Sequence, residues 1–130
     1  MKIGITQYEK LLHEEKLDLL LKGNSGFKGI SIGYARVGSD VKSIKDNIKE
    51  GDILVVPSTK PPDVPYLIRC DGIITDGGGK TSHAAVFCKY HNIPCIIGTG
   101  NATKILENYN GKLLIYVDMN IGLVYKIKEV

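Results

Sequence analysis

The stretch from residue 72 to residue 90 constrains the fold of this chain more than any other. Residues 72–75 are a short apolar run that predicts a buried strand, and residues 84–90 hold good helix formers with no breaker among them. A glycine-rich segment, residues 76–82, lies between the two. The pattern therefore predicts a strand, a flexible loop and a helix that begins within a residue or two of His83.

An imidazole at the start of a helix has a particular electrostatic environment. The first helical turn leaves backbone N–H groups unpaired and carries roughly half a positive charge. That charge disfavours a second one nearby, so we expect His83 in its neutral, nucleophilic form. The same helix end would favour a phosphoryl group on the ring. The adjacent glycines would let a bulky phosphoryl donor come close.

Other interpretations of this segment exist. A lone histidine near a helix start is usually a surface or capping residue. A glycine-rich loop before a helix can also hold a nucleotide, but a P-loop requires glycine five positions before Gly79, and that position is Ile74. The three consecutive glycines also lack the spacing of a dinucleotide-binding fingerprint.

Residues 75–85 and 92–103 carry a resemblance to a known family. They are similar to the phosphohistidine domain of PEP-utilising enzymes, such as PEP synthase, pyruvate phosphate dikinase and enzyme I of the sugar phosphotransferase system. The family's pattern is Gly-Gly-x-Thr-Ser/Cys-His followed by an Ile-Pro-Ala-Ile/Val-Val-Gly stretch, and the likeness runs from about Phe27 to Ile127. One departure is Ile32, where the family usually has proline in a turn.

The resemblance implies that His83 accepts a phosphoryl group, from PEP or a nucleotide-derived donor, and passes it to an acceptor. Thr81 is then the best candidate to orient the ring, with Ser82 sharing that work. Residues that would contact the phosphoryl group are Gly78, Gly79 and Lys80. Thr59, or Ser58 in its place, would donate a hydrogen bond to the ring or to the phosphoryl oxygens. Helix capping by the hydroxyl residues and a solvated surface position for Lys80 are the alternative interpretations.

By resemblance, the fold is α/β: a single, layer-packed domain of the swivelling β/β/α type. Residues 5–22 read as a helix with a capping box of Thr6 and Glu9, so we expect residues 1–26 to be an N-terminal helix and linker and residues 27–130 the phosphohistidine domain. Within that domain the sequence predicts strands over 29–37, 52–57 and 95–97 and a hairpin of 112–117 with 122–127. Short helices are predicted over 40–49 and from a start at Asp63 and Pro65 through to Cys70, and a third after Asn101 as its cap.

Composition narrows the functional classes. A chain of 130 residues suits one domain, and its net charge of +3 is too mild to indicate nucleic-acid binding. No apolar run approaches the length of a membrane-spanning helix and no signal peptide is evident, so we expect a cytoplasmic protein. The spacing of the three cysteines, Cys70, Cys88 and Cys95, is not that of a metal site. We therefore expect all three to be core residues and expect no metal site.

No nucleotide-binding domain or PEP-binding barrel fits in this length, so we expect no cofactor on this chain alone. By resemblance, Mg²⁺ with ATP or PEP would bind to partner domains, and nucleotide-binding and PEP- or pyruvate-binding chains would be the partners. Two alternatives remain: a regulatory or scaffold module that never receives phosphate, and a subunit of another His-dependent phosphotransferase for a small molecule.

Overall fold

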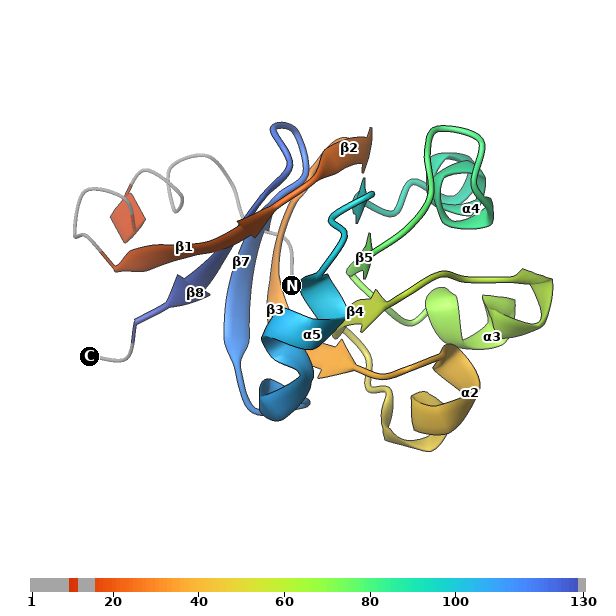
Figure 1. The fold of residues 1–130 in the computed structure, drawn as a ribbon, viewed down its shortest axis with the longest axis horizontal. Helices are drawn as coiled ribbons and strands as arrows, with labels where there is room; N and C mark the ends of the chain where they lie inside the picture. The colour runs from red at the N-terminus through yellow and green to blue at the C-terminus, as the bar shows by residue number, and fades with distance from the viewer. Residues whose placement is uncertain (1–9, 12–15, 129–130) are drawn as a thin grey trace.

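The computed structural model describes residues 10–11 and 16–128. Within them, eight strands form one sheet in the order β1-β8-β7-β3-β4-β5-β6-β2 (Figure 1). The strands are β1 (Leu17–Lys22), β2 (Asn24–Phe27), β3 (Ile30–Val37), β4 (Ile53–Val56), β5 (Gly72–Thr75), β6 (Cys95–Ile97), β7 (Leu114–Asp118) and β8 (Leu123–Ile127). The helices are α2 (Val41–Ile44), α3 (Val64–Leu67), α4 (His83–His91) and α5 (Ala102–Leu106), with 3-10 turns η1 (Lys45–Asn47), η2 (Pro61–Asp63) and η3 (Glu107–Tyr109). The predicted α/β class is confirmed.

The middle of the sheet is parallel and its flanks are antiparallel. Strands β3, β4, β5 and β6 run parallel to one another, whereas β7, β8 and β1 extend the sheet from β3 in antiparallel fashion and β2 pairs antiparallel with β6. Every residue of β4 and of β5 is buried. Burial on both faces explains why these two strands read in the sequence as continuous apolar runs.

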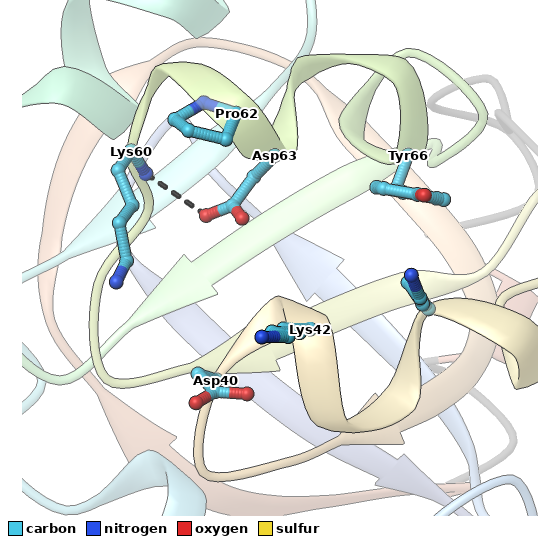
Figure 2. A pocket seen from close by; sticks show the side chains of 7 residues that line it. Asp40, Lys42, Lys60, Pro62, Asp63 and Tyr66 are labelled. Atoms are coloured by element: carbon cyan, nitrogen blue, oxygen red, sulfur yellow. Dashed lines mark hydrogen bonds between the residues drawn. The ribbon is translucent and has the colours of Figure 1, made fainter.

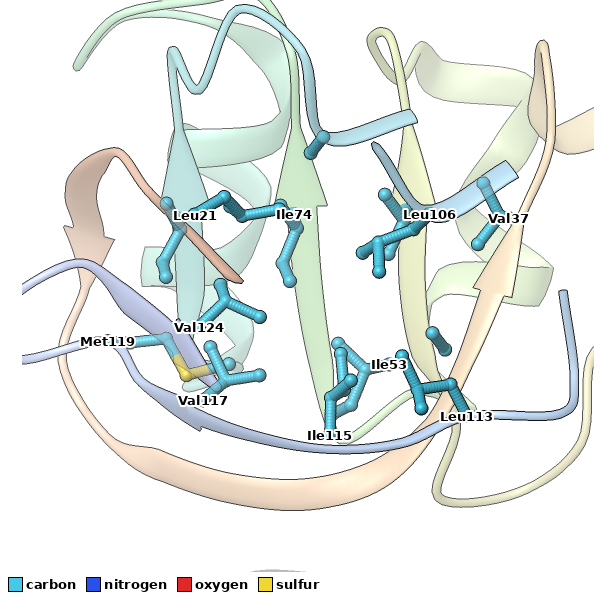
Figure 3. Close-up of a cluster of buried hydrophobic side chains, with 14 residues drawn as sticks. Leu21, Val37, Ile53, Ile74, Leu106, Leu113, Ile115, Val117, Met119 and Val124 are labelled. Atoms are coloured by element: carbon cyan, nitrogen blue, oxygen red, sulfur yellow. The ribbon is translucent and has the colours of Figure 1, made fainter. Parts of the chain in front are cut away.

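Two apolar clusters stabilise the two faces of the parallel strands. In β4, Ile53 and Val55 point into one cluster and Leu54 and Val56 into the other, as the alternation of a strand requires. The first cluster collects side chains from the strands and from α5, which point toward one another in Figure 3. The second lies beneath α2, α3 and α4, which Figure 1 shows together on the other side of the sheet.

The sheet curls because β1 and β2, its two edge strands, are separated in the chain by a single residue, Gly23. The Gly23 N–H donates to the carbonyl of Gly122 at 2.8 Å, beside β8. A Cβ atom at Gly23 would lie 2.6 Å from the Ile96 side chain, and one at Gly122 would lie 2.1 Å from the Gly23 carbonyl oxygen. Only glycines allow the chain to pass this closely from one edge of the sheet to the other.

The N-terminal part of the chain differs from the sequence prediction. The prediction of a helix over residues 5–22 is wrong for residues 17–22, which form β1 and pair with β8. The segment expected to be a linker contains β2, which pairs with β6. The Thr6–Glu9 capping box lies outside the described residues. The division of the chain at residue 27 stays a prediction.

The other predicted elements are present with altered lengths. The hairpin is formed by β7 and β8, and β3 runs straight through Ile32. The helix predicted over 40–49 is reduced to α2 and η1. The helix predicted to start at Asp63 and Pro65 is α3, which begins at Val64 directly after η2 but ends at Leu67 instead of Cys70. In the described part of the chain, no helix is long and apolar enough to span a bilayer.

Candidate functional site

The candidate site lies at the edge of the sheet where the parallel strands end. The loop after β4 carries Thr59, and the loop after β5 is the glycine-rich segment that leads into α4. Parallel strands deliver such loops to the same edge, which is where open α/β sheets commonly bind ligands. His83 is the first residue of α4, as the sequence predicts.

The His83 ring is held on two sides. Its Nδ1 atom lies 2.8 Å from the hydroxyl oxygen of Thr59, a residue only 8% exposed. The ring also stacks on Phe87, one turn further along α4, with centroids 6.1 Å apart. Among the described residues, the other ring nitrogen, Nε2, has no hydrogen-bond partner. The imidazole is therefore oriented through Nδ1 with Nε2 available.

Ser82 forms the start of α4. It occupies the N-cap position, where its hydroxyl accepts a hydrogen bond from the Ala85 N–H at 3.3 Å. Gly78 lies against it with φ +94°, and a Cβ atom at Gly78 would be 2.9 Å from Ser82 Cβ and Oγ. Gly78 is thus required both for its backbone conformation and for its close approach to the cap.

The base of the glycine loop is anchored to its neighbours. The N–H of Gly77 donates to the Pro57 carbonyl at 3.0 Å, and its carbonyl accepts from the Gly98 N–H at 3.2 Å and from the Thr75 hydroxyl at 2.7 Å. By contrast, the N–H groups of Gly78, Gly79 and Lys80 have no protein acceptor within the part of the chain that the structure describes. The loop is therefore fixed at its base and open at its tip.

Asp76 joins the loop to α5. One carboxylate oxygen accepts the Thr103 N–H at 2.9 Å, the other accepts the Thr103 hydroxyl, and the Asp76 carbonyl accepts the Gly100 N–H at 2.9 Å. The sequence predicts Asn101 as the cap of this helix. Asn101 does occupy the N-cap position, but its side chain makes no capping hydrogen bond, so that prediction is wrong in its chemistry.

The structure brings together some of the predicted site residues. A small hollow of about 80 Å³ is lined by Ser58, Thr59, Thr75, Gly77, Gly78, Ser82, His83 and Ala84. Thr81, Gly79 and Lys80 are exposed and lie outside this lining. The residue that is hydrogen-bonded to the ring is Thr59 rather than Thr81. The resemblance offered Thr59 or Ser58 as a partner of the ring or of the phosphoryl oxygens, and it is Thr59 that lies against the ring, 24 residues away in the chain.

The cysteines are free and buried, which confirms their prediction as core residues. Burial, assisted by the negative charge of Asp52, raises the pKa of Cys70 to about 12. The pKa of the Cys88 thiol is raised by its hydrogen bond with Cys95 and by burial. Such thiols stay protonated near neutral pH. Within the described residues, no group of three or more His, Cys, Asp or Glu side chains could hold a metal ion.

Comparison with known proteins connects this site to a family. Residues 48–122 match the family described as PEP-utilising enzyme, mobile domain. The chain is 44% identical over 112 residues to the phosphoenolpyruvate synthase of Pyrococcus furiosus, covering 86% of this chain and 13% of that protein. It is 40% identical over 109 residues to a probable phosphoenolpyruvate synthase of Methanothermobacter thermautotrophicus, covering 84% of this chain and 15% of that protein.

Solved structures share the fold. A structure of enzyme I is 28% identical, with a TM-score of 0.50 over 62% of this chain and 32% of that one. Aconitase X of Thermococcus kodakaraensis has a TM-score of 0.57 at 18% identity, over 83% of this chain and 98% of that one. At 18% identity, the similarity to aconitase X concerns the fold alone.

Proposed function

The chain belongs to the mobile-domain family of PEP-utilising enzymes, and we propose that it is a phosphoryl carrier in which His83 accepts a phosphoryl group and passes it on. The observation that carries this proposal is the 2.8 Å contact between His83 Nδ1 and the Thr59 hydroxyl. When Nδ1 bears the proton and donates it to Thr59 Oγ1, the lone pair of the neutral ring resides on Nε2.

Transfer then proceeds by substitution at phosphorus. The Nε2 lone pair forms the N–P bond while the P–O bond to the donor breaks, and the donor oxygen leaves with that electron pair. In the second step an acceptor oxygen forms a new P–O bond, and Nε2 recovers its lone pair. Nδ1 keeps its proton throughout, so Thr59 holds the ring in the same orientation in both states.

The glycine loop would receive the transferred group. Phosphoryl transfer depends mainly on positioning and on neutralising charge. The unpaired N–H groups of Gly78, Gly79 and Lys80 lie at the exposed tip of the loop, where they can donate to phosphoryl oxygens. The positive end of α4 and the Lys80 ammonium would add favourable charge. Thr81 and Ser82 would support this loop, Ser82 through its cap of α4.

The remaining chemistry belongs to other domains or chains. This chain spans 13–15% of the length of the two phosphoenolpyruvate synthases that it matches. We therefore propose that nucleotide-binding and PEP- or pyruvate-binding partners, with Mg²⁺ and ATP or PEP, supply the donor and the acceptor. The protein acts in the cytoplasm under this proposal and does not turn over either substrate alone.

The test is phosphorylation of the purified chain in an extract of its source organism with labelled PEP or labelled ATP. We expect acid-labile, base-stable label, mapped to His83 by mass spectrometry and lost in His83→Ala. His91→Ala is the matched control, because His91 is an exposed histidine on the same helix. Equal labelling of His83→Ala and wild type would contradict the proposal. No label from either donor would favour a regulatory or scaffold module, provided that added PEP synthase is active in that extract.

A further inference from the structure

A second hollow lies between α2 and the segment that runs from Lys60 through η2 into α3 (Figure 2). Its volume is about 370 Å³, and it is lined by Asp40, Lys42, Lys45, Lys60, Pro62, Asp63 and Tyr66. That volume falls in the range of about 300–1,000 Å³ that is typical of small-molecule sites. We propose that it binds a small phosphate-bearing anion with several negative charges, such as a diphosphate group.

The positive charge of the hollow comes from three lysines on two separate segments. Lys42 belongs to α2, Lys45 to η1, and Lys60 to the loop that follows β4. Within the described residues, none of these ammonium groups forms an ion pair. Lysine is a compact point charge that commonly binds phosphate, and its flexible stem adapts to ligands of different shape.

The two carboxylates of the lining are already engaged by the backbone. Asp63, which is 7% exposed, accepts the Lys60 N–H at 2.9 Å, the contact that is dashed in Figure 2. Asp40 accepts the Ser43 N–H at 2.7 Å and caps α2. Because both carboxylates serve as caps, they hold the two walls of the hollow in place. With three lysines and two carboxylates, the lining keeps a net positive charge.

The location of the hollow supports a ligand that contains phosphate. Lys60 follows Thr59, whose hydroxyl contacts His83, so one loop lines both this hollow and the smaller one at His83. Both lie where the parallel strands end, the usual edge for ligands in such sheets. Figure 2 shows Tyr66 at the far end from Lys60, where its ring bounds the space. The site uses no residue of the His83 hollow, so anion binding here does not depend on transfer by His83.

Inorganic pyrophosphate is the probe that tests this inference. Its affinity would be measured by calorimetry at low ionic strength, and its site by backbone amide shifts in NMR spectra. We expect saturable binding, with shifts at residues 40–45 and 60–66. The triple variant Lys42→Gln/Lys45→Gln/Lys60→Gln should bind about tenfold more weakly. Circular dichroism would verify that it folds.

The matched control is Lys89→Gln/Lys104→Gln/Lys112→Gln, which removes the same charge from exposed positions outside the lining. It should keep wild-type affinity, as should His83→Ala. If the affinity for pyrophosphate fell equally in the two triple variants, the decrease would be due to net charge alone, and the inference would be overturned. It would also be overturned if pyrophosphate did not bind, or if the shifts were confined to residues 77–83. His83→Ala removes the carrier residue and leaves this hollow intact. Binding of pyrophosphate to that variant therefore tests the hollow alone, and labelling of His83 tests the carrier proposal alone.

Discussion

The two loops that meet at His83 follow neighbouring parallel strands, yet they are built in opposite ways. The loop after β4 buries Thr59 and then turns into η2, where Asp63 accepts the Lys60 N–H. The loop after β5 leaves residues 78–81 exposed and, among the residues that the structure describes, is held only at its base and at Ser82. One loop gives the ring a fixed partner, and the other keeps its N–H donors exposed to solvent.

This difference shows how a carrier site can be both ordered and accessible. A side chain that orients an imidazole must be held in place, because a displaced hydroxyl would no longer contact the ring nitrogen. A phosphoryl group that has to enter from one partner and leave to another needs unobstructed space and free N–H donors. Four substitutions, with their controls, test this division from the largest expected effect to the smallest.

Gly78→Ala should cause the largest loss. At φ +94°, with its Cβ 2.9 Å from Ser82, alanine would be strained and would displace the cap of α4. We expect a loss of about 1–3 kcal/mol in the free energy of unfolding, together with most of the phosphorylation of His83. Urea denaturation and labelling would measure the two effects.

Gly79→Ala is the matched control for that substitution. A Cβ atom at Gly79 would meet no atom of a non-adjacent residue within 4 Å, and Gly79 is not among the glycines with positive φ. The stability of this variant should stay within about 0.5 kcal/mol of wild type. Equal destabilisation by the two alanines would show that the whole loop, and not Gly78 alone, is conformationally constrained.

Asp76→Ala should destabilise the protein by about 1–3 kcal/mol, because it removes the acceptor that caps α5 and ties the loop base to it. Thermal denaturation would measure the change. Asn101→Ala provides the contrast, since Asn101 makes no capping bond and should be nearly neutral. If Asn101→Ala were the more damaging of the two, the assignment of Asp76 as the cap would be contradicted.

Thr59→Val should slow phosphorylation of His83 about tenfold while costing about 0.5–1.5 kcal/mol of stability. Valine fills the same space but cannot hydrogen-bond Nδ1, so the ring loses the contact that orients it. Thr59→Ser restores the hydroxyl and should recover most of the rate. The measurement is the initial rate of label incorporation; a Val variant as fast as the Ser variant would argue against a positioning role.

Lys80→Gln should have the smallest effect, a few-fold decrease in the labelling rate with no change in stability. The Lys80 side chain is exposed, so its charge is screened by solvent and salt. The decrease should disappear as ionic strength rises. A salt-independent loss would instead indicate a direct, desolvated contact with the phosphoryl group.

The sequence predicted most of the parallel core but not its N-terminal edge. Residues 53–56 and 72–75 are apolar almost throughout, and burial on both faces is the usual reason for that pattern. Residues 17–22 are rich in leucine, a strong helix former, and therefore suggested a helix. Pairing with β8 overrides that preference, because strand propensity depends more on tertiary neighbours than on the residues themselves.

By itself, the sequence determined the local arrangement at His83: a buried strand, a glycine loop and a helix that starts at that residue. These features arise between residues close together in the chain, so composition and spacing suffice to reveal them. Only the tertiary structure decided that Thr59 contacts the ring, that Asp76 caps α5 and that the lysines of two segments share one hollow. Each of these depends on the order and register of the strands, which long-range packing sets and no local pattern encodes.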